Sequence, residues 1–256
     1  MSRTATRALD LFDCVVTAPH PLGLMEIAEA TGLDKSTTQR LLTLLVDRRM
    51  LSRDPLTKQY SLGTHAYGLA AAINTRSDLV ALAAPHFVRL RDESGESVSL
   101  HVPDGTHRVC VDGLESRQEI RQVVSLGESL PIHQGPSGKA ILAFLPQPEA
   151  DAIVTAAKPT AVERQRIAEG VASLRRNGYL HTEGDRSPGV RALSAPIFDA
   201  RGVCASLSIA GPADRWSEER ALMSVDALIS VTGEISRGLG GSRPSLARDE
   251  PNPAHR

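Results

Sequence analysis

The stretch that most constrains this chain is a pair of short helical patterns between residues 24 and 51. In MEIAEAT and again in KSTTQRLLTLLVDR, apolar residues recur at three- and four-residue steps, as on one face of a helix. Only Gly32, Leu33 and Asp34 separate the two patterns. A three-residue connection with a glycine is typical of a helix-turn-helix, so we expect residues 24–51 to form this motif.

The second helix of the pair divides into a buried and an outer face. Leu41, Leu42, Leu45 and Val46 form an apolar stripe, and Asp34 can cap the helix by accepting backbone N–H bonds. In a helix-turn-helix the first turns of this helix enter the major groove of DNA. The outer residues suited to contacts with base edges or phosphates are Lys35, Ser36, Thr37, Gln39, Arg40 and Thr43.

A wing is expected directly after this helix. Residues 50–53 and 59–62 read as two short strands around DPLTK, a turn that places Lys58 at its tip. A preceding helix at residues 4–16 presents Ala8, Leu11, Phe12 and Val15 on one face, which we expect to pack under the motif. Residues 1–62 are therefore predicted to form a winged helix-turn-helix that binds double-stranded DNA.

Charge supports this interpretation only locally. The whole chain of 256 residues has a net charge of −1, but residues 1–77 hold nine Lys or Arg against seven Asp or Glu. That part is thus +2 and the remainder −3, which gives the motif a modest basic patch for phosphate contact. The sequence shows neither a signal peptide pattern nor an uncharged apolar run near 20 residues, so we expect a cytoplasmic protein without a membrane partner.

The pattern changes class beyond about residue 76. Residues 63–77 are predicted to form a linker helix, residues 78–240 a second domain, and the polar, proline-rich residues 241–256 a disordered tail. Within the second domain we expect strands at 97–102, 107–115 and 120–127, a hairpin at 194–211, and helices at 79–93, 137–144, 149–157, 163–177 and 217–239. This mixture predicts an α+β domain of GAF-like type.

Several segments together resemble the IclR family of bacterial transcriptional regulators. They are the wing end QYSLG, then PIHQGPSGKAILAFL, RRNGYL, SPGVRALSAPIFDARG and SLSIAGPADR, in the order and spacing of that family up to about residue 240. The resemblance implies a homodimer or homotetramer whose N-terminal domains bind a palindromic operator and whose C-terminal domains bind a small effector. The two recognition helices would lie roughly 34 Å apart, one turn of DNA.

The resemblance also implies where the effector binds. The pocket would be walled by Leu130, Pro136, Ser137, Gly138, Val190, Ala192, Ser208 and Ala210, with Thr182 or Glu183 at its rim. Backbone N–H groups at the helix start after Gly135 can attract a carboxylate, and Ser137 and Ser208 can hydrogen-bond it. We expect an apolar pocket with few polar groups, which suits a small organic acid. Because some relatives carry polar residues at the positions of Ala192 and Ala210, a hydrophobic or aromatic acid is favoured.

Other chemistries find less support in the sequence. GPSGKA lacks the residues of a phosphate loop, because His133 and Ala140 stand where that motif needs Gly and Ser or Thr. The eight histidines form no metal-binding pattern and no nucleophile elbow is present, so we expect no metal, no cofactor and no enzyme activity. Cys110 and Cys204 fall in predicted strands, as structural thiols do. Arg121 and Arg191 each interrupt an apolar strand pattern. Either could bind an effector carboxylate, but we expect each to form an ion pair within the protein.

Two alternatives remain open at this point. One is a small-molecule-binding or enzymatic GAF-like protein with a degenerate helix-turn-helix. The other is a DNA-organising protein without an effector, in which the second domain serves only assembly.

Overall fold

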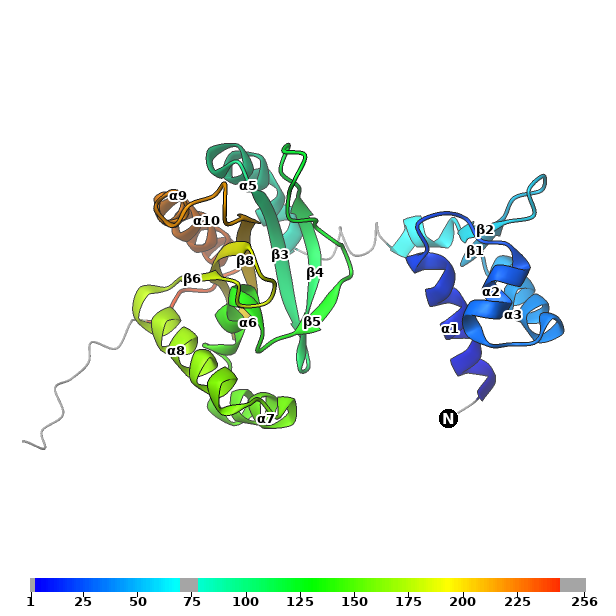
Figure 1. The fold of residues 1–256 in the computed structure, drawn as a ribbon, viewed down its shortest axis with the longest axis horizontal. Coiled ribbons are helices and arrows are strands. Elements are labelled where there is room, and N and C mark those ends of the chain that lie inside the picture. The colour runs from blue at the N-terminus through cyan, green and yellow to red at the C-terminus, as the bar shows by residue number, and fades with distance from the viewer. Residues whose placement is uncertain (1–2, 70–77, 245–256) are drawn as a thin grey trace, which may run out of the picture. The chain divides into compact units, whose positions relative to one another are not determined.

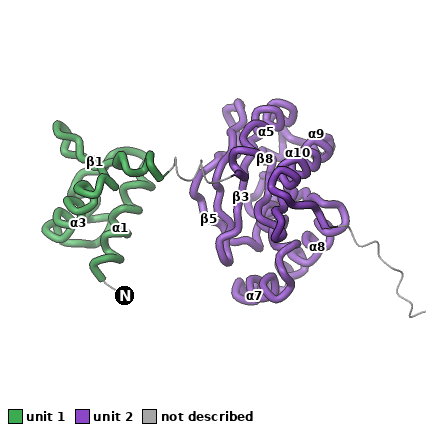
Figure 2. Tube along the Cα trace, turned by 180° about the vertical axis from the view of Figure 1, so that it is seen from behind, with its two compact units in different colours: residues 1–77 green, residues 78–256 purple. Residues whose placement is uncertain are grey.

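The computed structural model describes residues 3–69 and 78–244 of the chain. It divides into two compact units, Met1–Ser77 and Asp78–Arg256, which Figure 2 shows in different colours. No described helix is long and apolar enough to cross a membrane.

Unit 1 is a three-helix bundle followed by a two-stranded hairpin. Its elements are α1 (Arg3–Thr17), α2 (Leu24–Thr31), α3 (Lys35–Asp47), β1 (Leu51–Arg53) and β2 (Tyr60–Leu62). The core contains the residues that the helical periodicity predicted, Leu11 and Val15 of α1 and Leu41, Leu42 and Leu45 of α3, together with Ile27, Leu51 and Tyr60. The expected winged helix-turn-helix is therefore confirmed.

The turn of the motif depends on two residues. Gly32 ends α2 with a φ of 66°, a left-handed conformation that glycine adopts without steric cost. Asp34 then caps α3, since its carboxylate accepts a hydrogen bond from the backbone N–H of Thr37 at 2.9 Å. Hydrogen bonds from the Ser36 hydroxyl and from the Thr37 backbone N–H lower the pKa of Asp34 well below its usual range, so the cap is ionised at neutral pH.

The linker-helix prediction falls partly on residues that the structure describes. Helix begins at residue 65 and continues to residue 69, and residues 70–77 lie outside the described residues. Residues 245–256 of the predicted tail also lie outside the described residues. Gly240, the last residue of the predicted second domain, forms a β-bridge with Asp199.

Unit 2 is built on an antiparallel sheet of six strands in the order β5-β4-β3-β8-β7-β6 (Figure 1). The strands are β3 (Ser97–Asp104), β4 (His107–Leu114), β5 (Ser129–Pro131), β6 (Leu180–Glu183), β7 (Val190–Asp199) and β8 (Gly202–Pro212). The helices are α5 (Asp78–Ser94), α6 (Gly135–Leu142), α7 (Gln147–Ala157), α8 (Ala161–Asn177), α9 (Glu218–Met223) and α10 (Val225–Gly238).

The two faces of the sheet differ in character because successive side chains of a strand point to opposite faces. One face packs on α5 and α10, through apolar residues such as Val98 and Leu100 of β3 and Leu207 and Ile209 of β8. The alternate residues of the same strands include Ser97 and Ser99 of β3 and Ser206 and Ser208 of β8. The sheet therefore has one apolar face, which forms the main core, and one serine-rich face, on the side of α6.

Two expectations for unit 2 are wrong. Residues 120–127 form no strand, because their backbone bonds to side chains, with Ser97 Oγ donating to the Gln122 carbonyl and Val124 N donating to Glu115. The expected final helix is two helices with a break at Ser224. There the N–H of Ser224 bonds to Ala221, three residues back, and ends α9, while its carbonyl accepts the bond from Leu228 that starts α10.

Candidate functional site

The outer face of α3 is free to meet another molecule. Lys35, Ser36, Arg40 and Thr43 are exposed, and Thr37 and Gln39 are half-buried. The Gln39 amide donates weakly to the Tyr60 hydroxyl at 3.4 Å, so this side chain connects the helix to the hairpin. The structure thus places all six predicted residues of α3 on or beside one accessible surface.

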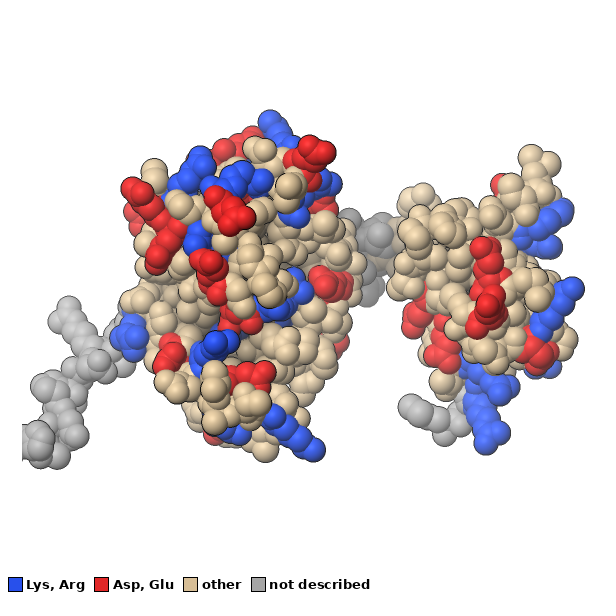
Figure 3. All heavy atoms as spheres, viewed as in Figure 1, with Lys and Arg blue, Asp and Glu red and all other residues tan. Residues whose placement is uncertain are grey.

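The hairpin after α3 is a rigid, basic wing. The Asp54 carboxylate accepts backbone bonds from Leu56 and Thr57, which fixes the turn. The guanidinium of Arg53 lies 5.5 Å from the centre of the Tyr60 ring, and Lys58 is exposed at the turn. In Figure 3, Lys and Arg side chains of this unit lie along the wing, on the α3 side and near the start of α1, and Asp and Glu side chains lie between them.

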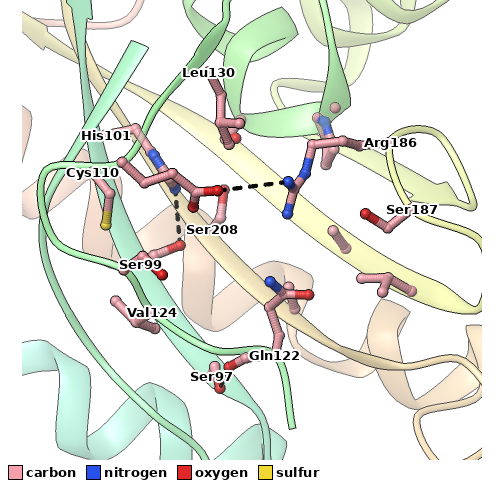
Figure 4. Close-up of a pocket in the computed structure, with 18 of the residues that line it drawn as sticks. Ser97, Ser99, His101, Cys110, Gln122, Val124, Leu130, Arg186, Ser187 and Ser208 are labelled. Atoms are coloured by element: carbon pink, nitrogen blue, oxygen red, sulfur yellow. Dashed lines mark hydrogen bonds and ion pairs between the residues drawn. The ribbon is translucent and has the colours of Figure 1, made fainter. Parts of the chain in front are cut away.

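Unit 2 contains a pocket on the serine-rich face of the sheet. It encloses about 690 Å³, its open mouth included, between the strands, the start of α6, residues 122–128 and residues 185–187. Figure 4 shows Ser99, His101 and Ser208 directed into this space from the sheet.

Eight of the ten predicted effector residues line this pocket: Leu130, Pro136, Ser137, Thr182, Val190, Ala192, Ser208 and Ala210. Gly138 does not, because it lies against the wall, where a Cβ would clash with the Ile132 carbonyl and come within 2.9 Å of Arg108 Nη1. Glu183 does not either, since its carboxylate pairs with Arg191. Gly138 and Glu183 therefore do not line this pocket, and of the two residues offered for its rim Thr182 is the one that does.

The lining is more polar than expected. Strands β3 and β4 and the two loops contribute a set of polar and charged residues that the sequence did not place there: Ser97, Ser99, His101, Arg108, Cys110, Gln122, Ser125, Glu128, Asp185, Arg186 and Ser187. The alternation of serine with apolar residues along β3 was the available signal. The pocket thus holds more polar groups than the few that were expected, and the preference for a hydrophobic acid stays a prediction.

Several charged groups of the wall are paired. The Lys139 ammonium, on a residue only 3% exposed, donates to both oxygens of the Asp185 carboxylate at 2.8 and 2.7 Å. Arg186 lies 3.9 Å from Glu128, one of the dashed contacts in Figure 4. Because a buried charge is costly unless it is paired, the Lys139–Asp185 pair fixes this part of the pocket wall, whereas the more exposed Arg186–Glu128 contact contributes less.

His101 and Cys110 lie opposite each other on β3 and β4. Burial, together with the nearby Arg108 and Arg186 charges, lowers the pKa of His101 to about 3, so the imidazole is neutral at pH 7. Its Nε2 atom lies 3.0 Å from Ser99 Oγ. Burial raises the pKa of Cys110 to about 11, so this thiol is an unreactive part of the wall.

Comparison with known proteins identifies the family. The model of the family described as "Bacterial transcriptional regulator IclR C-terminal" matches residues 71–237, and that of the IclR helix-turn-helix domain matches residues 4–55. The chain belongs to the IclR family. The Transcriptional repressor IclR of Escherichia coli (strain K12) is 28% identical to it over 250 residues, which cover 94% of this chain and 91% of that protein.

Solved structures of this family share the fold. The crystal structure of Thermotoga maritima IclR aligns with a TM-score of 0.77 at 28% identity and covers 93% of this chain and 98% of that chain. An IclR homolog from Microbacterium hydrocarbonoxydans, solved in complex with 4-hydroxybenzoate, aligns with a TM-score of 0.78 at 20% identity and covers 93% and 99%. The two family models and the named relatives identify the chain as a transcriptional regulator, not an enzyme, with an N-terminal helix-turn-helix and a C-terminal effector domain.

Two arginines and one thiol that the sequence singled out, Arg121, Arg191 and Cys204, have structural roles in this IclR-family regulator. Arg191 binds Glu183 and donates to the carbonyls of Ala213 and Trp216, and Arg121 binds Glu115 at 2.6 Å. Neither arginine lines the pocket. Burial raises the pKa of Cys204 to about 11. Among residues 3–69 and 78–244 no cluster of three or more His, Cys, Asp or Glu could hold a metal ion.

Proposed function

We propose that this regulator binds a palindromic DNA operator as a homodimer or homotetramer and is switched by a small organic acid bound in the unit 2 pocket. The observation that carries the proposal is the accessible polar face of α3 beside a basic wing, in a chain that also holds a small-molecule pocket. Such a protein would act in the cytoplasm, where its operator is.

The DNA contacts follow from the chemistry of the exposed side chains. Arg40 and Gln39 can each make two parallel hydrogen bonds to a base edge, to guanine and adenine respectively. Lys35, Ser36, Thr37 and Thr43 suit phosphate oxygens or single base contacts, and Lys58 reaches the backbone from the wing. The E. coli relative, named a transcriptional repressor, supports the assignment of this unit to DNA.

The effector assignment rests on the pocket itself. Its walls converge on Ser137, at the start of a helix, and on Ser208, whose hydroxyl bonds to Ser194. The complex of the Microbacterium homolog with 4-hydroxybenzoate is compatible with an acid ligand, but at 20% identity that likeness concerns the fold alone. Effector binding would alter the spacing or tilt of the DNA-binding units through residues 63–77. A coupling free energy of about 1 to 3 kcal/mol changes operator affinity roughly 5- to 150-fold.

A pocket-filling substitution tests this proposal. Ser137 is buried, so Ser137→Leu should occupy the pocket while the α3 surface, which belongs to the other unit, stays intact. Operator affinity is measured by fluorescence anisotropy with and without a panel of organic acids. We expect one acid to change the affinity of the wild type by at least fivefold and to leave Ser137→Leu unaffected, while both proteins bind operator equally without acid.

The exposed Ser230→Leu provides a matched control, because it adds the same side chain outside the pocket and should respond like the wild type. A Ser137→Leu protein that still responds to the acid would show that the effector binds elsewhere.

A further inference from the structure

The side chain of Arg108 is buried in the pocket wall with part of its guanidinium unused. The residue is 2% exposed and lines the pocket. Its Nη1 atom donates to the carbonyls of Pro131 at 2.7 Å and Gln134 at 2.9 Å, whereas its buried Nε–H has no hydrogen-bond partner. Two carbonyls thus fix the orientation of the guanidinium, and its Nη2 donors, which form no hydrogen bond with any described residue, remain for another group.

In the described part of the chain the charge of Arg108 has no ion-pair partner, and the Glu128 and Asp185 carboxylates act on it only over longer distances. Asp185 is bound by Lys139, and Glu128 lies nearest to Arg186. Among the described residues no carboxylate oxygen comes within 4.0 Å of the Arg108 nitrogens. Burial lowers the pKa of Arg108 only to about 10, so it remains charged at pH 7. The pocket therefore carries one buried positive charge without a partner, an arrangement that favours an anionic ligand.

The start of α6 adds to this electrostatic preference. The guanidinium packs against the first turn of that helix, where a Cβ on Gly135 would lie 3.3 Å from Nη2. All eight residues of α6 are buried, and the N-cap residue Gln134 makes no side-chain capping bond. The positive end of a helix and an arginine side chain thus meet at one place in the pocket.

A second unused polar atom lies nearby. His101 is 8% exposed, and its Nδ1 atom has no hydrogen-bond partner, although Nε2 contacts Ser99. In register, His101 faces Cys110, the residue two positions after Arg108 on the same strand. A neutral imidazole cannot balance a carboxylate but can hydrogen-bond a hydroxyl group.

We propose that Arg108 is the carboxylate anchor of the effector and that the ligand is a small monocarboxylate whose polar substituent meets His101. This inference rests on the proposed function and names the group that recognises the acid. It moves the anchor from Ser137 and Ser208 to β4, where the guanidinium can hold a carboxylate by two parallel hydrogen bonds.

The test compares acids with their neutral amides on the full-length protein. Acetate, glycolate, lactate, benzoate and 4-hydroxybenzoate, each with its amide, are titrated at constant ionic strength and followed by ¹H–¹⁵N NMR. We expect at least one acid to bind the wild type tenfold or more tightly than its amide and to shift the Arg108 Nε–H signal. In Arg108→Met this preference should fall below twofold.

Arg186→Met is the matched control, because Arg186 lines the same pocket, is 30% exposed and already has Glu128 as a neighbour. It should keep the acid preference. If Arg108→Met does not fold, Arg108→Gln replaces it, because it also removes the charge but keeps hydrogen-bonding groups, and it should likewise lose the preference. The shift of the wild-type Nε–H signal is measured without any substitution.

The anchor is rejected if no acid is preferred over its amide in the wild type, or if Arg108→Met retains the preference. Operator binding, measured in parallel, separates the two proposals. A protein whose operator affinity responds to an acid regardless of Arg108 keeps the proposed function and loses the anchor. Acid binding that depends on Arg108, without any operator binding, would keep the anchor and reject the proposed function.

Discussion

At the scale of single residues, His101 couples the pocket to the stability of unit 2. Its imidazole is buried and neutral in the folded protein, with a pKa lowered from 6.5 to about 3 by desolvation and by the Arg108 and Arg186 charges. The unfolded chain therefore takes up the proton first as the pH falls below 6.5. Stability is fully present above pH 6.5 and is lost progressively between pH 6.5 and 3.

We predict that His101→Gln weakens this pH dependence. From pH 7 to pH 5 the wild type should lose about 2 kcal/mol of unfolding free energy on account of His101, a loss absent from the variant. Urea denaturation at the two pH values measures the difference. The pKa values of His133 and His181 are also lowered, mainly by burial, but both residues are present in both proteins and their contributions cancel. Equal pH dependence in the two proteins would contradict the assignment.

Pocket residues that lie in segments resembling the IclR family could be predicted from the sequence. Pocket residues that are buried only by contacts with distant parts of the chain could not. Ser137 and Ser208 stand in segments with a recognisable order, so they could be placed in the pocket. Arg108 stands in a strand where an exposed arginine would be equally acceptable, and its burial follows from the path of residues 131–138 against it. Lys139 likewise depends on Asp185, 46 residues away.

At the scale of elements, α3 combines a rigid inner face with a free outer one. Leu41, Leu42 and Leu45 fix the helix in the core, and Asp34 fixes its first turn. The side chains of Lys35, Ser36 and Arg40 are thereby presented by a backbone that needs no rearrangement on binding. Preorganisation of this kind reduces the entropy cost of association.

We predict that Arg40→Ala loses about 1 to 3 kcal/mol of specific operator binding, since a two-bond contact to a base is worth that much. Competition gel shifts against nonspecific DNA measure the loss. Arg164→Ala, an equal change of charge at an exposed position of α8, is the control and should bind like the wild type. An unchanged affinity for Arg40→Ala would remove this side chain from the set of contact residues.

Elements with strong periodicity could be predicted, and elements defined by tertiary contacts could not. The apolar stripes of α1 and α3 and the turn at Asp199 to Gly202 matched the structure. Residues 120–127 have alternating apolar character, yet Ile120 and Val123 are exposed and the backbone bonds to Ser97 and Glu115 side chains. The break at Ser224 involves no proline or glycine and left no sign in the sequence.

At the scale of the whole molecule, the two units differ in net charge as they differ in role. Net charge is +2 in residues 1–77 and −3 in the remainder, so phosphate attraction resides in the DNA-binding unit. Because the patch on one chain is modest, the proposed operator binding would need the recognition helices of two chains acting together. Each contact that neutralises a phosphate makes the affinity more sensitive to salt.

The most direct test of the regulator assignment is a salt-titrated gel shift with the DNA immediately upstream of this protein's own gene, repeated with DNA fragments selected from a random pool. We predict tight binding that resists nonspecific competitor, with the logarithm of the affinity falling linearly against the logarithm of the salt concentration. Weak binding that competitor abolishes, for the upstream DNA and for every selected fragment, would contradict the account.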